Sequence, residues 1–180
     1  MDKSALVSEL LELFRQHGYE GVSIGDVSKA TGLGKSSLYH HFPGGKEEMA
    51  LEVLGHIDMA VKQYFIAPLK AEGAPEAKLK AMAKTIEDFY EGGRKGCIVD
   101  GLTLGAASAP FQELIRNCLE AWIEAMAAVA KEHGVSEKLA RERAENALIA
   151  IEGALVVSRA LQNYQIFKRV TRNLPRLILD

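Results

Sequence analysis

Apolar residues recur three or four positions apart along nearly all of this chain of 180 residues. This spacing places them on one face of an α-helix, whereas a half-buried β-strand would alternate apolar and polar residues. The sequence contains no such alternating segment and no internal repeat. It therefore predicts an all-α fold.

The composition narrows the class of protein further. Lys and Arg number 22 against 24 Asp and Glu, for a formal net charge of −2, and 48% of the residues are hydrophobic, which is typical of a folded protein. No apolar run approaches the roughly 20 residues of a membrane-spanning helix. Asp2, Glu9 and Glu12 interrupt the apolar residues at the N-terminus and exclude a secretory signal. We therefore expect a cytoplasmic protein.

The N-terminal part of the chain has the layout of a helix-turn-helix. Ser23 and Asp26 form an S-x-x-D capping box at the start of a short helix. Gly32 is the left-handed residue expected after that helix, and a second helix is predicted over 35–42, before Pro43. The outward face of the second helix carries side chains that suit contacts with DNA. They are Lys35, Ser36, Ser37, Tyr39 and His40.

Two further groups can reach DNA phosphates. Lys46 opens the next helix, and the backbone amides near Ser23 lie at a helix N-terminus, where anions bind. Residues 23–46 hold three lysines and one aspartate, so the overall charge of −2 conceals a small cationic patch. Because the cations are few, we expect modest non-specific affinity for DNA and tight binding only from a dimer.

The remainder of the chain predicts longer helices. The first runs from Lys46 to Pro68, and the second begins at Pro75. A short helix is expected within 96–110, followed by a long one that closes at Gly134. Two more helices complete the chain, the last with a kink at Pro175.

A motif covers residues 14–48, which read FRQHGYEGVSIGDVSKATGLGKSSLYHHFPGGKEE. Its diagnostic residues are Phe14, Gly18, Tyr19, Ser23, Ile24, Asp26, Val27, Ala30, Gly32, Leu33, Leu38, Tyr39, Phe42, Lys46, Glu47 and Glu48. This segment resembles the DNA-binding domain of TetR-family transcriptional regulators. Residues 43–46 (PGGK) and 96–99 (GCIV) are similar to the LmrA/YxaF-like subgroup.

The resemblance implies a homodimeric regulator that binds a pseudo-palindromic operator in double-stranded DNA and, as is common in the family, acts as a repressor. It also implies that a small molecule binds the C-terminal domain and so changes the affinity of the protein for the operator. It implies a helix-turn-helix domain at residues 1–45 and a helical ligand-binding and dimerisation domain at 46–180. Residues 35–40 would face the DNA groove, with Tyr39 and Lys46 on phosphates. Gly25 stands where many relatives have a longer side chain that touches DNA, and Gly34 replaces the usual serine at the helix N-cap.

Aromatic and sulfur-containing residues of the C-terminal part, beside small residues at 101–109, indicate either a packed core or a pocket for a largely apolar molecule. Asp100 is interpreted as a capping residue or as an anchor for a polar ligand group. Cys97 is either a small buried hydrophobe or a thiol sensor. The candidate pocket residues are Met59, Phe65, Phe89, Cys97, Asp100, Leu102, Trp122 and Met126.

Small residues along 144–158 permit close approach of another helix, either from a second subunit or from the same one. The candidate dimer residues are Leu148, Ile151, Leu155, Phe167 and Val170.

Other functional classes lack the required spacing. His40 and His41 diverge on a helix and have no third metal ligand, and Lys29 stands where a phosphate-binding P-loop needs glycine. We therefore expect no catalytic residue, no metal and no cofactor. The alternatives to a ligand-responsive regulator are a regulator that binds DNA constitutively and an all-helical enzyme.

Overall fold

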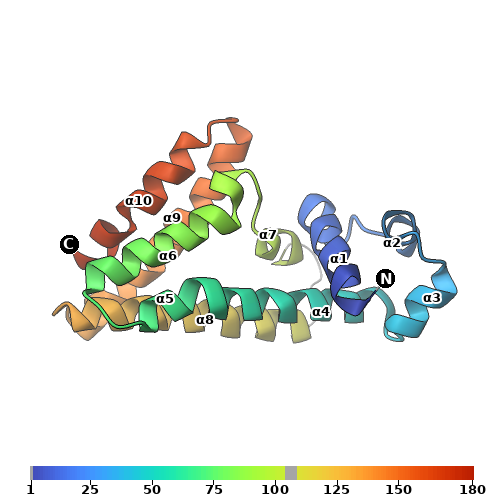
Figure 1. Cartoon of the computed structure of the whole chain (residues 1–180), viewed down its shortest axis with the longest axis horizontal. Helices are drawn as coiled ribbons and strands as arrows, with labels where there is room; N and C mark the ends of the chain where they lie inside the picture. The colour runs from blue at the N-terminus through green and yellow to red at the C-terminus, as the bar shows by residue number, and fades with distance from the viewer. Residues whose placement is uncertain (1, 104–108) are drawn as a thin grey trace. The chain divides into compact units, whose positions relative to one another are not determined.

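The computed structural model describes residues 2–103 and 109–180, and every regular element within them is helical (Figure 1). In chain order the elements are α1 (Lys3–His17), α2 (Ile24–Thr31), α3 (Lys35–His41), α4 (Gly45–Ala60), the π-helix η1 (Val61–Ile66), α5 (Ala67–Lys70), α6 (Pro75–Phe89), the 3-10 helix η2 (Glu91–Gly93), α7 (Ile98–Thr103), α8 (Ala109–Glu132), α9 (Glu137–Ala160) and α10 (Gln165–Leu179). The prediction of an all-α fold is confirmed. Among these residues, no helix has both the length and the apolarity to cross a membrane.

Helix α2 begins and ends at the residues that the sequence predicts, and α3 ends at His41, one residue before the predicted end. The Asp26 N–H donates to Ser23 Oγ at 3.2 Å, and the Ser23 N–H donates to Asp26 Oδ2 at 3.0 Å, which completes the capping box. Hydrogen bonds from the Ser23 hydroxyl and backbone hold the pKa of the Asp26 carboxyl below its ordinary value. Gly32 follows α2 with a φ of 69°. These local signals therefore set the start and the end of α2.

The helix that follows α3 continues past Pro68, where the sequence predicted its end. Its segment Val61–Ile66 is π-helical. Because proline has no N–H, the Tyr64 carbonyl, four residues before Pro68, loses the donor that an α-helix would supply. The Thr85 hydroxyl of α6 donates to this carbonyl instead. A tertiary contact thus supplies this carbonyl with a donor that proline cannot provide.

The chain forms two compact units. They comprise Met1–Asp58 with Cys97–Arg116, and Met59–Gly96 with Asn117–Asp180. This division differs from the predicted boundary between residues 45 and 46, because α4 and α8 each continue from one unit into the other. It also assigns α7 to the first unit, where α7 packs against α1.

Rings from four elements form the centre of the second unit. We call this group the aromatic cluster; it consists of Phe65, Phe89, Tyr90, Trp122 and Phe167. The Phe65 ring centroid lies 4.8 Å from Trp122 and 5.2 Å from Phe89. Tyr90 lies 6.1 Å from Phe65 and 6.0 Å from Phe167. The cluster therefore joins η1, α6, α8 and α10 through edge-to-face and tilted ring contacts.

Candidate nucleic-acid interface

Helices α2 and α3 are joined by a three-residue turn in the first unit (Figure 1). Val27 of α2 and Leu38 of α3 are fully buried and therefore lie on the inner faces of the two helices. The Ser28 hydroxyl donates to the Leu33 carbonyl at 2.6 Å, and the Thr31 hydroxyl donates to the Val27 carbonyl at 2.7 Å. Side chains of α2 therefore satisfy backbone groups of the turn and of the last helical turn before it, which favours one geometry of the pair.

The opposite face of α3 is polar and open to solvent. All five residues predicted for this face are exposed, with Tyr39 at 48%. They are Lys35, Ser36, Ser37, Tyr39 and His40. The helical period points Ser36, Ser37, Tyr39 and His40 away from the buried Leu38, and Lys35, the first residue of α3, is exposed as well. The face offers a cation, three hydroxyls and an imidazole, which are groups that bind phosphates and base edges.

The first turn of α2 supplies backbone donors of its own. Ser23 lies on the surface, and its hydroxyl and N–H are engaged with Asp26. The N–H groups of Ile24 and Gly25 lie in the first turn, where an α-helix has no backbone acceptor for them. Gly25 is partly exposed and has no side chain to keep an anion away from these amides. The turn can therefore accept a phosphate through its backbone.

Lys46 does not extend freely into solvent. Its Nζ donates to the Tyr19 carbonyl at 3.1 Å and lies 4.3 Å from the centroid of the Tyr19 ring. Burial raises the pKa of the Tyr19 phenol, and the carboxylates of Glu47 and Glu20 raise it further. The sequence prediction included Lys46 and missed Tyr19 as its partner. The family motif contains Tyr19, but nothing in the local pattern shows which side chain it meets.

The candidate pocket residues are divided between the two units. Phe65, Trp122 and Met126 are buried in the second unit, where Phe89 is partly exposed. Met59 is 62% exposed and so does not share their buried environment. The predicted set omitted Tyr90 and Phe167, which the structure adds to the aromatic cluster. The sequence signal available for both was an aromatic residue in an apolar pattern at helical spacing.

The three other candidate pocket residues belong to the first unit. Cys97 and Leu102 are buried there. Asp100 lies in α7, and its side chain is outside the described part of the structure, as are residues 104–108 of the predicted small-residue segment.

The candidate dimer residues mostly face inward within one chain. Leu148 is 7% exposed, and Ile151, Leu155 and Phe167 are fully buried, because α10 packs against α9. The Phe167 N–H donates to the buried hydroxyl of Ser158 at 3.0 Å. The structure thus uses these four residues for the packing of α9 and α10 in one subunit, and they do not form an exposed surface.

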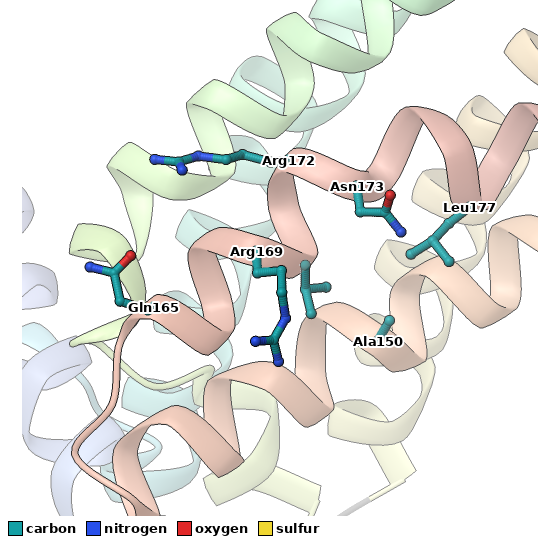
Figure 2. Close-up of a pocket in the computed structure, with 7 residues that line it drawn as sticks. Ala150, Gln165, Arg169, Arg172, Asn173 and Leu177 are labelled. Atoms are coloured by element: carbon teal, nitrogen blue, oxygen red, sulfur yellow. The ribbon is translucent and has the colours of Figure 1, made fainter.

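Different apolar residues of the same two helices are exposed. On α9 they include Ile149 at 66% and Val156 at 48%, and on α10 Leu177 at 36%. An open groove of about 760 Å³ is lined by residues of the same two helices, Leu177 among them (Figure 2). Its lining consists of Ala150, Gln165, Arg169, Val170, Arg172, Asn173 and Leu177. Val170 is the one predicted dimer residue among these.

The described residues contain no group of three or more His, Cys, Asp or Glu side chains placed to hold a metal ion.

Models of two protein families match the chain. "Bacterial regulatory proteins, tetR family" matches residues 6–53, and "Transcriptional regulator LmrA/YxaF-like, C-terminal domain" matches residues 76–173. Curated relatives include the HTH-type transcriptional regulator LmrA of Bacillus subtilis (strain 168), 25% identical over 98% of this chain and 96% of the relative. The uncharacterized HTH-type transcriptional regulator YxaF of the same organism is 24% identical over 92% of this chain and 89% of its own length.

Solved structures agree with the fold. A TetR transcriptional regulator from Legionella pneumophila superposes with a TM-score of 0.87 at 17% identity, covering 99% of this chain and 98% of that one. The regulatory protein TetR from Rhodobacter sphaeroides gives 0.82 at 23% identity, covering 98% of each chain.

The matched relatives are transcriptional regulators and not enzymes, and regulators of this family bind operator DNA and act as dimers. The resemblance seen in the sequence is confirmed in both halves of the chain. The helix-turn-helix of α2 and α3 is the DNA-binding element, and the chain belongs to the TetR family of bacterial transcriptional regulators, with a C-terminal domain of the LmrA/YxaF-like type.

Proposed function

We propose that the chain is the subunit of a homodimeric cytoplasmic repressor, which leaves a pseudo-palindromic operator when a small, largely apolar molecule binds its C-terminal part. The observation that most supports contact with DNA is the exposed polar face of α3. A homodimer would present two copies of this face to successive major grooves, about 34–36 Å apart. The symmetry of the operator would then mirror the symmetry of the protein.

Each group at the interface has a distinct role in this proposal. Ser36, Ser37 and His40 face base edges in the groove, and Lys35 supplies a cation at the start of α3. Tyr39 and Lys46 contact phosphates, together with the first-turn amides that begin at Ser23 and include Gly25. Phosphate contacts set the position of the protein on DNA, and base contacts provide the sequence preference.

The exposed apolar residues of α9 and α10 support a dimer face on these helices. Ile149 and Val156 are exposed on α9, and Leu177 of α10 lines the groove of Figure 2. A two-fold pair of subunits would bring the same surface of each together and remove these side chains from water.

The proposed binding site for the small molecule is the aromatic cluster. Met82 and Met126 are fully buried in the same unit, and methionine side chains adapt to differently shaped apolar partners. Phe65 stands on the π-helical segment, and such segments are frequent at functional sites. The molecule must bind the DNA-free arrangement better than the DNA-bound one, and operator DNA must weaken its binding by the same factor.

A footprint on the DNA upstream of the gene tests the DNA-binding part of the proposal. We expect a protected region with two-fold symmetry. Lys46→Ala should weaken binding to all sequences about tenfold and lower the slope of log affinity against log salt by about 2 per dimer, because each subunit loses one phosphate contact. Lys70→Ala, at an exposed position of α5, is the matched control and should leave both values unchanged. An asymmetric footprint, or an unchanged slope for Lys46→Ala, contradicts these assignments.

Fluorescence of Trp122, the single tryptophan of the chain, tests the ligand part. Its ring lies 4.8 Å from Phe65, and its Nε1–H donates to Met82 Sδ at 3.3 Å, so a molecule that enters the cluster must change its surroundings. Fused-ring aromatic compounds, beginning with 1-naphthol, are titrated with and without operator DNA. The expected result is a saturable change in emission whose midpoint rises when operator is present. Binding with no dependence on operator indicates a constitutive regulator.

A further inference from the structure

Tyr19 lies at a junction of four segments in the first unit. It follows Gly18, at the end of α1, and its N–H donates to the Gly101 carbonyl of α7 at 3.1 Å. Its ring meets that of Phe111, in the first turn of α8, edge-on at 5.1 Å. Its carbonyl accepts a hydrogen bond from Lys46 at the start of α4, at 3.1 Å. Tyr19 therefore connects α7 and α8 with Lys46, the cation that we propose contacts DNA.

The contact between α1 and α7 has little room for adjustment. Gly18 has a φ of 68°, and a Cβ on Gly101 would lie 3.1 Å from both Gly18 Cα and the Phe14 carbonyl oxygen. Both neighbours are backbone atoms, which cannot rotate aside as a flexible side chain can. A displacement of α7 would therefore move the backbone at Gly18 and Tyr19 with it.

The contact between Tyr19 and Lys46 orders a side chain that is otherwise among the most flexible. The Lys46 ammonium lies 4.3 Å from the centroid of the Tyr19 ring, within the range of a cation–π interaction. An ammonium group has three N–H donors, and the Tyr19 carbonyl uses one of them. Two donors remain for a phosphate, and less side-chain entropy is lost when the phosphate binds.

We propose that Tyr19 is a positioning residue, which holds Lys46 toward operator phosphate and makes the placement of Lys46 depend on Gly101 of α7 and Phe111 of α8. The inference rests on the proposed phosphate contact of Lys46. It assigns a physical route by which a change in α7 or at the start of α8 alters DNA affinity without moving α3.

A double-mutant cycle on the full-length protein tests the inference. Operator affinity and its salt dependence are measured for the parent, Tyr19→Leu, Lys46→Ala and the double variant. Tyr19→Leu should weaken operator binding about tenfold, because each of the two subunits loses a cation–π contact. It should also lower the salt slope toward the value of Lys46→Ala. In the Lys46→Ala background the same substitution should change affinity less than about twofold, since its effect passes through the lysine.

Two further variants separate positioning from loss of structure. Tyr19→Phe keeps the ring and the carbonyl and should recover most of the affinity lost by Tyr19→Leu. Phe111→Leu keeps apolar bulk but removes the ring contact, and it should weaken binding about threefold, again only when Lys46 is present.

Each other result has a defined meaning. An equal loss from Tyr19→Leu with and without Lys46 shows a structural role and overturns the inference, as does tighter binding, which would show that Tyr19 keeps Lys46 away from DNA. A Lys46→Ala variant that binds like the parent refutes the proposed phosphate contact and the inference together. Absence of any footprint from the parent protein refutes the proposed operator itself.

Discussion

Replacing Ile149 with glutamate is expected to convert the protein into a monomer and to weaken operator binding by roughly 10²–10⁴-fold. Ile149 is 66% exposed on α9 and precedes Ala150, which lines the groove between α9 and α10. In a two-fold pair the substitution enters the interface twice, so two carboxylates would replace apolar contacts and lose water, a cost that the nearby Arg169 and Arg172 offset only in part. A monomer contacts one half-site and loses the high effective concentration that a linked second subunit provides.

Sedimentation equilibrium and operator titration check this prediction on the same samples. Ala128→Glu is the matched control, because it adds the same charge at an exposed position of α8 outside the proposed face. The control should remain dimeric and bind operator like the parent. A dimeric Ile149→Glu variant with full affinity would place the subunit interface on another surface.

Replacing Gly93 with alanine is expected to lower the free energy of unfolding by about 2–5 kcal/mol. Gly93 has a φ of 95°, which is strained for a residue with a side chain, and an added Cβ would lie 2.8 Å from Phe167 Cβ. Phe167 is fully buried in the aromatic cluster and has no free space into which to withdraw. The substitution therefore combines backbone strain with overpacking.

Gly134 provides a control that separates these two costs. Its φ is 104°, close to that of Gly93, but an added Cβ would meet no atom within 4 Å. Gly134→Ala should therefore show the strain alone, about 1–2 kcal/mol, in urea unfolding at one protein concentration. Equal losses for the two variants would mean that Phe167 moves aside at no cost.

The limits of the helices were predictable where the signal lies within a few residues. The Ser23 capping box and the left-handed Gly32 both stand where the sequence places them, because the atoms that cap a helix come from its own first and last turns. The expected end at Pro68 was wrong for the opposite reason. The Thr85 hydroxyl, 21 residues away, donates a hydrogen bond to the Tyr64 carbonyl, and no local sequence pattern predicts such a contact.

The exposed face of α3 was predictable to the residue, whereas the surfaces of the C-terminal part were not. On a helix of seven residues with one buried position, the 3.6-residue period turns Ser36, Ser37, Tyr39 and His40 outward, and Lys35 is exposed as the first residue of the helix. Leu148 and Ile149 are adjacent and similarly apolar, yet they are 7% and 66% exposed. Only the tertiary packing around α9 decides which of them is core and which is surface.

The sequence by itself determined the helical class, the helix-turn-helix and its polar face, because these depend on residues one to four positions apart, and the family, because its motif is one continuous segment. The tertiary structure decided that α7 joins the N-terminal unit, that the predicted dimer residues are mostly core, and that Lys46 is held by Tyr19, 27 residues away. Such contacts depend on which distant segments the folded chain brings together. Helical periodicity places each side chain on a face of its helix, but it carries no information about the neighbour that covers that face.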